Sequence, residues 1–325
     1  MPPCMTIKRV SLALLAALLM VGCGEKQPEP PKVFMTTDIS PEGLVKVFEA
    51  LEVPFEGRVA VKISTGERGG HNFLKPELIK DLVQKVEGTI VECNVAYPGA
   101  RYSNEEHWNT IKYHGFYDIA PCDIMDEFGE VKIPVQDTTH LKFNIVGDHV
   151  ANYDWMINLA HFKGHTMGGF GGVLKNQSIG VASSNGKAYI HSAGKVTTKE
   201  ELWAGIGETE QAHFLEAMAA AAQSVHEYYE GRMVYINVMN NLSVDCDCSA
   251  HPADPEMKDI GILASYDPVA LDQACVDLVF EYPSIEGDDA SALIERINSR
   301  HGVHIIEHAE KIGLGSRTYE LVSID

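Results

Sequence analysis

The pattern His-Phe-Lys-Gly-His at residues 161–165 places two imidazoles and an amine within five residues. Histidine is the side chain best suited to proton transfer near neutral pH, and lysine adds a positive charge. We therefore expect His161, Lys163 and His165 to supply acid–base chemistry to an anionic substrate. The competing interpretation is that the imidazoles only bond backbone carbonyls of a loop, and the sequence leaves both open.

A glycine-rich stretch continues from this group, between a predicted strand and a predicted helix. Because glycine loses extra backbone entropy on folding, we expect a backbone-specific role here, such as aiming amide N–H groups at an anion. The spacing fits neither a dinucleotide-binding loop nor a phosphate loop, and a tight structural turn is the alternative. The expected contacts to a small anionic ligand are Gly168, Gly169, Gly171, Gly172, Lys175, Lys187 and Arg101.

The 7 cysteines include one Cys-x-Cys pair, Cys246 and Cys248, on a loop after a predicted strand. Two thiols one residue apart can face an iron–sulfur cluster or another soft metal. Such a site needs further ligands, and the candidates are Cys93, Cys275 and His251, or else substrate or water. The alternatives are a short-loop disulfide or no role for the pair. Cys275 lies in a predicted buried helix, where a thiol more often serves as a small core side chain.

The first residues predict export from the cytoplasm. A basic start, Lys8 and Arg9, precedes an apolar stretch over residues 10–21, which is too short to span a bilayer and suits a signal peptide. The stretch ends in Met-Val-Gly-Cys, which resembles a bacterial lipobox. We therefore expect residues 1–22 to be a lipoprotein signal peptide, Cys23 to be lipidated, and residues 23–33 to be a flexible tether. The expected location is the bacterial cell envelope, with the membrane as a partner through the lipid; an ordinary signal peptide or an anchor helix is the alternative.

Charge excludes one class of partner. The chain has 26 Lys and Arg against 46 Asp and Glu, a net charge of −20. Binding to duplex nucleic acid needs a surplus of cations, so nucleic acid is not an expected partner. Against this acidic background the clustered Lys163, Lys175 and Lys187 are informative, because their local charge opposes that of the whole chain.

Strand and helix patterns alternate along the remaining chain. Apolar runs rich in β-branched residues predict strands at 59–63, 89–93, 155–160, 233–239 and 260–264. Helical spacing and N-cap signals predict helices at 41–51, 76–86, 104–114, 200–230 and 268–281. This alternation indicates an α/β fold with a mainly parallel central sheet flanked by helices. Residues 127–150 predict a small antiparallel insert, and residues 34–325 form a single expected domain.

Several blocks of the sequence resemble one known family. They are HFKGHTMGGFGGVLKN (161–176), GVASS (180–184), INVMNNLSVDCDC (236–248) and DIGILASYDPVALDQAC (259–275), with residues 92–101 and the tail at 313–319. In this order they resemble the domain-of-unknown-function 362 family. Members are described as iron–sulfur proteins, and many carry a ferredoxin module with eight cysteines. Here residues 187–230 contain no cysteine, so the ferredoxin ligands of the family are missing.

Three functions remain open at this point. The first is a redox-associated protein of the cell envelope that binds a metal or an iron–sulfur cluster. The second is a cluster-free enzyme or binder of a small anionic ligand. For this class the fold suggests an analogy to lactate-racemase-like proteins, which use His and Lys around an organometallic cofactor. The third is a lipoprotein interaction module. Convergence of the cysteine pair, Cys93 and the 161–176 loop on one cleft would favour a functional site.

Overall fold

The computed structural model describes residues 29–325, so the expected signal peptide, Cys23 and the first part of the tether lie outside the described residues. Eight strands form one sheet in the order β12-β1-β11-β10-β7-β2-β3-β4. Seven strands run parallel, and only β11 runs opposite to its neighbours β10 and β1. The strands are β1 (Lys32–Thr36), β2 (Val59–Lys62), β3 (Thr89–Glu92), β4 (Cys122–Ile124), β7 (Trp155–His161), β10 (Met233–Met239), β11 (Gly261–Ser265) and β12 (Glu320–Ser323).

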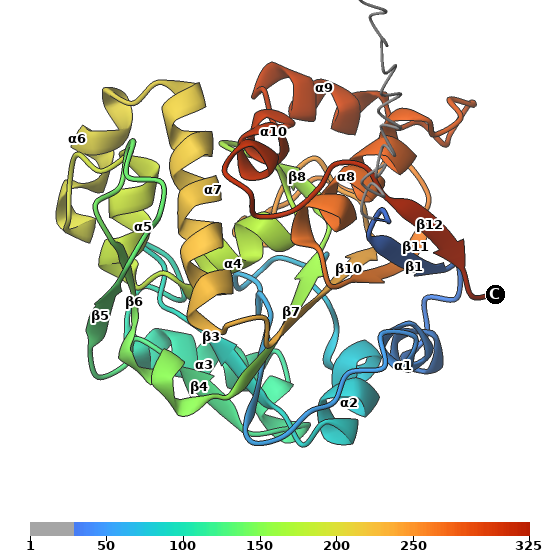
Figure 1. The fold of residues 1–325 in the computed structure, drawn as a ribbon, viewed down its shortest axis with the longest axis horizontal. Coiled ribbons are helices and arrows are strands. Elements are labelled where there is room, and N and C mark those ends of the chain that lie inside the picture. Colours follow the sequence, from blue (N-terminus) through green and yellow to red (C-terminus); the bar gives the residue numbers. More distant parts are fainter. Residues whose placement is uncertain (1–28) are drawn as a thin grey trace, which may run out of the picture.

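Helices cover both faces of this sheet (Figure 1). One face carries α1 (Pro41–Glu49), α2 (Pro76–Lys85) and α3 (Asn104–Tyr113). The other carries α4 (Val173–Val181), α7 (Gln211–Tyr228), α8 (Pro268–Phe280), α9 (Ser291–Ser299) and α10 (His304–Lys311). The central strands β2, β7 and β10 are buried along their whole length because both faces are covered, which explains their continuous apolar runs.

The N-cap residues of α1 and α8 are the ones that the sequence predicts. The side chain of Ser40 accepts from the amide of Gly43 at the start of α1. Asp267 does the same for two amides at the start of α8, where Pro268 occupies the first helical position. The predicted helix over 200–230 is interrupted. The structure has a short α6 (Leu202–Gly207), a break at residues 208–210, and then α7.

Two small antiparallel sheets accompany the main one. β5 (Glu130–Ile133) pairs with β6 (Asn144–Gly147), as expected for the insert at 127–150. β8 (Lys163–His165) pairs with β9 (Gly169–Gly171), so the expected glycine loop is largely a tight hairpin. Gly169 has φ 83° and packs against the backbone of Gly302, where a side chain would collide. Backbone conformation and close packing therefore suffice to explain why residue 169 is a glycine.

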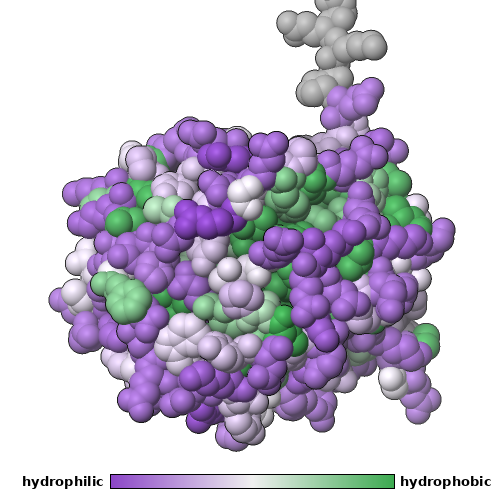
Figure 2. All heavy atoms as spheres, turned by 90° about the horizontal axis from the view of Figure 1, so that it is seen from below, coloured by the Kyte–Doolittle hydropathy of each residue, from purple (hydrophilic) through white to green (hydrophobic). Residues whose placement is uncertain are grey.

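The α/β class with a mainly parallel sheet is confirmed. β1 begins at Lys32, so the last two residues of the expected tether belong to the sheet. Among residues 29–325 no helix is both long and apolar enough to cross a membrane. Hydrophilic side chains cover most of the face drawn in Figure 2, with hydrophobic ones in smaller groups between them.

Candidate functional site

A cavity of about 260 Å³ lies where the parallel strands β2, β3, β7 and β10 end. Its walls include side chains from the segment after each of these strands. Carboxyl ends of parallel strands meet at one edge of a sheet, and open α/β sheets place their binding sites there. The three segments that the sequence indicated therefore converge: residues 92–101, residues 163–175 and residues 246–248 all line this cavity.

Positive side chains dominate the polar part of the wall. Five cations line it: Lys62, Lys163, Lys175, Lys187 and Arg101. In the described part of the chain, only two carboxylates, those of Glu92 and Asp247, lie among them. The apolar part of the wall comes from β-strand ends and from helices, with Trp203 of α6 exposed beside it. The apolar lining residues are Val95, Ala96, Met167, Ile179, Leu202 and Ile206.

Lys62 and Lys187 are held by backbone and amide oxygens. The Nζ of Lys62 donates to the carbonyl of Ile63 and to Oδ1 of Asn176, the latter at 3.1 Å. Burial lowers the pKa of Lys62 to about 8. The Nζ of Lys187 donates to the carbonyl of Ala182 at 2.6 Å. Both ammonium groups are thus fixed in the wall by partners that accept hydrogen bonds.

Arg101 is fixed by a buried carboxylate network. Its Nη1 donates to Glu92 Oε1 at 2.6 Å, and its Nη2 donates to the hydroxyl of Tyr97 at 3.1 Å. His107 Nε2 lies 3.1 Å from the other oxygen of Glu92. Burial alone would raise the pKa of Glu92, but Arg101 and His107 hold it well below its usual range. Arg101 therefore serves as a rigid part of the cavity wall.

Asp247 lies between two residues of the His-x-Lys pattern. His161 Nδ1 bonds its Oδ1 at 2.9 Å, and Lys163 Nζ lies 2.9 Å from its Oδ2. The other nitrogen of His161 bonds the carbonyl of Asn240 at 2.6 Å. Each ring nitrogen of His161 thus faces an oxygen atom. Burial would raise the pKa of Asp247, but His161 and Lys163 hold it far below its usual range.

His165 is held in one neutral tautomer. Its Nδ1 accepts from the amides of Gly168, at 2.8 Å, and Met167, at 3.2 Å. The ring hydrogen must therefore lie on Nε2. Burial, followed by the charge of Lys175, lowers the pKa of His165 well below its ordinary value. His165 thus presents an N–H donor, not an imidazolium.

The start of α4 does not offer its first amides to a ligand. The amides of Val173 and Leu174 donate to the two carboxylate oxygens of Asp272, at 2.9 and 3.0 Å. A side chain at Gly172 would collide with that carboxylate. Burial raises the pKa of Asp272 to about 6 despite these bonds and one from Asn237. The expectation that glycines and amides form an external anion cradle is wrong for this helix start, because an internal carboxylate occupies it.

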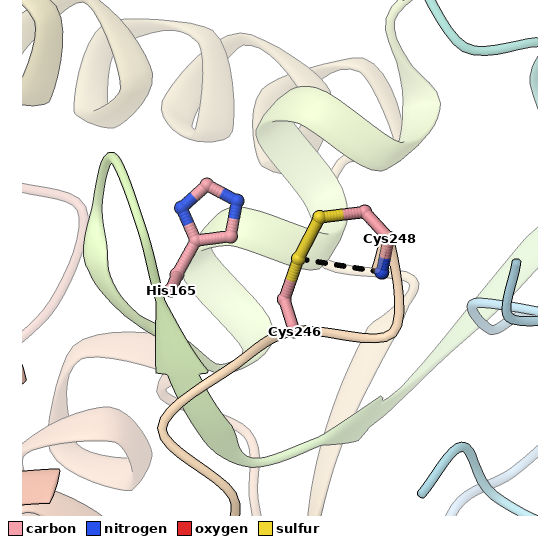
Figure 3. A group of neighbouring side chains, drawn as sticks. All are labelled: His165, Cys246 and Cys248. Atoms are coloured by element: carbon pink, nitrogen blue, oxygen red, sulfur yellow. Dashed lines mark hydrogen bonds between the residues drawn. A yellow bond between two sulfur atoms is a disulfide. The ribbon is translucent and has the colours of Figure 1, made fainter. Parts of the chain in front are cut away.

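Cys246 and Cys248 form a disulfide in this structure. One ligand atom of each cysteine and one ring nitrogen of His165 lie within 4.8 Å of one another, so this group could hold a metal ion. In Figure 3 the ring of His165 extends toward the two sulfur atoms. Holding a metal here requires reduction of the disulfide, since thiolates are the metal ligands.

The other two expected metal ligands do not join this group. Cys93 lines the same cavity, but its thiol donates to the carbonyl of Val181, and burial raises its pKa. Cys275 is buried in α8 away from the cavity lining, where it accepts from the side chain of Asn237. The described residues thus do not present four sulfur ligands at one point, and they do not fit a four-cysteine iron–sulfur cluster.

The sequence analysis named some of the side chains that line the cavity and missed others. His161, Gly168 and Gly169 do not line the cavity; His161 supports Asp247 instead. Gly171, Gly172, Lys175, Lys187 and Arg101 do line it. Lys62 and His191 were missed. A signal existed for Lys62, because it is the one charged residue in the apolar run VAVKI, and a buried lysine in such a run needs an explanation.

A family comparison agrees with the motifs. Residues 59–277 match the family model described as a domain of unknown function, DUF362. The chain belongs to the DUF362 family. The match includes every strand and loop that lines the cavity, from Lys62 to Cys248. No protein with a curated description matches this DUF362 chain.

Solved structures with a similar arrangement are distant in sequence. One is a Thermotoga maritima protein from a structural genomics consortium, with 15% identity and a TM-score of 0.44; the match covers 73% of this chain and 57% of that one. Another is the lactate racemase apoprotein of Thermoanaerobacterium thermosaccharolyticum, with 12% identity and a TM-score of 0.42; it covers 76% of this chain and 56% of that one. The DUF362 chain therefore spans little more than half the length of these structures.

Proposed function

We propose that the protein binds a small anionic organic molecule in the cavity at the carboxyl ends of β2, β3, β7 and β10. The observation that carries this proposal is the convergence of five basic side chains on one cavity in a chain of net charge −20. Two carboxylates balance only part of that charge. An anion entering the cavity would supply the missing negative charge in a partly desolvated place, where electrostatic interactions are strong.

The size and the apolar wall restrict the ligand. A cavity of about 260 Å³ suits a small molecule and excludes a polymer segment of any length. The apolar side chains beside the cations favour an organic skeleton over a bare inorganic anion. A carboxylate or phosphate group would lie against the lysines, and its carbon part would lie against residues such as Ile179 and Leu202.

Thermal unfolding with small anions tests this proposal. We expect oxalate or malonate to raise the melting temperature of the protein more than chloride does at equal ionic strength. Lys175→Met removes a basic side chain from the cavity and is expected to weaken this effect by at least about tenfold in Kd. Lys80→Met, on the exposed face of α2, is the matched control and should leave it unchanged. Equal stabilisation by chloride and by the dicarboxylates would contradict the proposal.

A second candidate is a soft metal ion held by His165, Cys246 and Cys248. The observation that favours it is the closeness of their ligand atoms. Two changes must accompany binding: the disulfide must be reduced, and His165 must move its hydrogen from Nε2 to Nδ1, which breaks its bonds to the amides of Met167 and Gly168. The ion would add a Lewis acid to the cavity wall.

Metal analysis of reduced protein separates the two candidates. Protein prepared without oxygen is incubated with Zn²⁺ and desalted, and its zinc content is measured. One equivalent in the wild type and none in Cys246→Ser would support the metal site. Cys122→Ser is the control, because this thiol bonds a backbone carbonyl near β4 and does not line the cavity. Equal zinc contents in all three proteins would exclude the site.

A further inference from the structure

Lys175 differs from the other four cations of the cavity. Lys62, Lys163, Lys187 and Arg101 each donate to an oxygen or pair with a carboxylate. Within residues 29–325, no hydrogen bond or ion pair holds the Nζ of Lys175. The side chain lines the cavity from α4. Its amine is therefore available to a ligand without loss of an existing contact.

Cationic neighbours surround this amine. Lys163 lies beside it over Gly171: a side-chain carbon built on that glycine would be 3.3 Å from Lys175 Cδ and 3.5 Å from Lys163 Cε. Among the described residues, the charged and titratable groups that face Lys175 are Lys62 from β2, Lys163 and His165 from β8, Arg101, His191 from α5 (Ser184–His191), and one carboxylate, that of Asp247. Burial and these cations lower the pKa of Lys175 to about 7.

An amine in this position is a nucleophile at neutral pH. Solvent-exposed lysines are almost fully protonated there and cannot attack a carbonyl carbon. Desolvation next to another cation is the known physical route to a reactive lysine amine. Since the pKa of Lys175 lies near 7, a large fraction of its amine is uncharged at that pH.

We propose that Lys175 forms an imine with an anionic aldehyde or ketone bound in this cavity. This inference rests on the proposed function and specifies its substrate class: a carbonyl compound that carries a carboxylate or phosphate. The amine lone pair attacks the carbonyl carbon, and the carbonyl oxygen takes up a proton to give a carbinolamine. Loss of the hydroxyl group as water then leaves a C=N bond. The net reaction is amine plus carbonyl to imine plus water, with no oxidant or reductant.

Two other residues of the cavity suit this step. His165 holds its hydrogen on Nε2 and lines the same cavity, so it can donate to an oxygen that gains negative charge. Lys163 remains paired with Asp247 and contributes positive charge for the anionic group of the ligand. Lys175 is thus the reacting group, while the remaining cations bind the anionic group of the ligand.

Reductive trapping with glyoxylate tests the inference. The whole protein is incubated at pH 7 with glyoxylate and cyanoborohydride, which converts an imine into a stable carboxymethyl amine, and the modified peptides are identified by mass spectrometry. We expect Lys175 to be modified at least about tenfold faster than exposed lysines such as Lys80. Excess oxalate, an anion without a reactive carbonyl, should slow the reaction at Lys175 and leave Lys80 unaffected.

Matched variants keep the two proposals separable. Lys175→Arg preserves the charge but lacks a nucleophilic amine, so we expect it to retain oxalate binding and lose the rapid modification. Lys80→Arg should be modified at Lys175 at the wild-type rate. Oxalate binding with equal modification of Lys175 and Lys80 overturns the imine and leaves the proposed function intact. Failure of oxalate to bind the wild type overturns the proposed function itself.

Discussion

The Nζ of Lys163 lies 2.9 Å from Oδ2 of Asp247, and this ion pair joins the hairpin of β8 to the loop of the cysteine pair. Both side chains are almost inaccessible to solvent, at 8% and 2% exposed. His161 bonds the other oxygen of the same carboxylate. One buried carboxylate therefore fixes two residues of the His-Phe-Lys-Gly-His pattern and with them one wall of the cavity.

Asp247→Asn is expected to destabilise the protein by about 3–5 kcal/mol, because the buried ammonium of Lys163 loses its counter-charge and His161 loses its charged hydrogen-bond partner. Urea unfolding at pH 7 measures the loss. Asp254→Asn is the control: that carboxylate is 90% exposed and pairs with His71, so its loss should cost less than about 1 kcal/mol. A loss no larger than that of the control would show that Asp247 does not hold the wall.

The same variant has a predictable pH dependence. The pKa of Asp247 is depressed in the folded protein, so its contribution to stability is present above the ordinary aspartate pKa and disappears as the pH falls through the folded value. The difference in unfolding free energy between the wild type and Asp247→Asn should therefore shrink as the pH falls below about 4, the ordinary aspartate pKa.

Asp272→Ala is expected to destabilise the protein by about 1–3 kcal/mol, since the amides of Val173 and Leu174 lose their acceptor in a buried place. Hydrogen exchange of these two amides should accelerate more than exchange in the middle of α7. Glu281→Ala, an exposed position at the end of α8, is the control and should change stability by less than about 0.5 kcal/mol. Unchanged exchange at 173 and 174 would argue against the cap.

Strand and helix positions follow from local sequence because their signals are local. The run at 233–239 is fully buried and became β10, and Asp267 with Pro268 began α8 where expected. The direction of β11 could not be predicted in this way. It depends on the path of residues 240–260, which carry the cysteine pair and return the chain beside β10 in the opposite sense.

The site was predictable as a set of segments but not as a set of contacts. Parallel strands bring their carboxyl ends together, so the convergence of Arg101, Lys175 and Cys246 follows from the sheet. The partners of each side chain depend on long-range packing. Two features for this reason became visible only in three dimensions. Asp272, an ordinary helix residue in the sequence, accepts from the first amides of α4, and His161 bonds the carbonyl of Asn240 and does not line the cavity.

Lipidation at Cys23 stays a prediction, because this residue lies outside the described part of the chain. Acyl chains add about 0.8 kcal/mol of membrane affinity for each buried CH₂ group. We therefore expect the protein made in a bacterial host to enter the detergent phase of a Triton X-114 extract, and Cys23→Ala to remain in the aqueous phase. Cys4→Ala should behave as the wild type; detergent partition of Cys23→Ala would contradict the lipid anchor.

Lys175→Met is expected to stabilise the protein at neutral pH. The pKa of Lys175 is depressed to about 7 in the folded protein, while an unfolded chain has an ordinary lysine pKa near 10.4. Between these values the unfolded state binds one proton more, so stability rises with pH by about 1.4 kcal/mol for each pH unit. Methionine removes this dependence. The gain of the variant over the wild type should thus be a few kcal/mol at pH 7, fall steadily as the pH rises, and vanish only above the unfolded pKa near 10.4. Urea unfolding across that range measures it. A gain that does not change with pH would show that Lys175 is charged throughout.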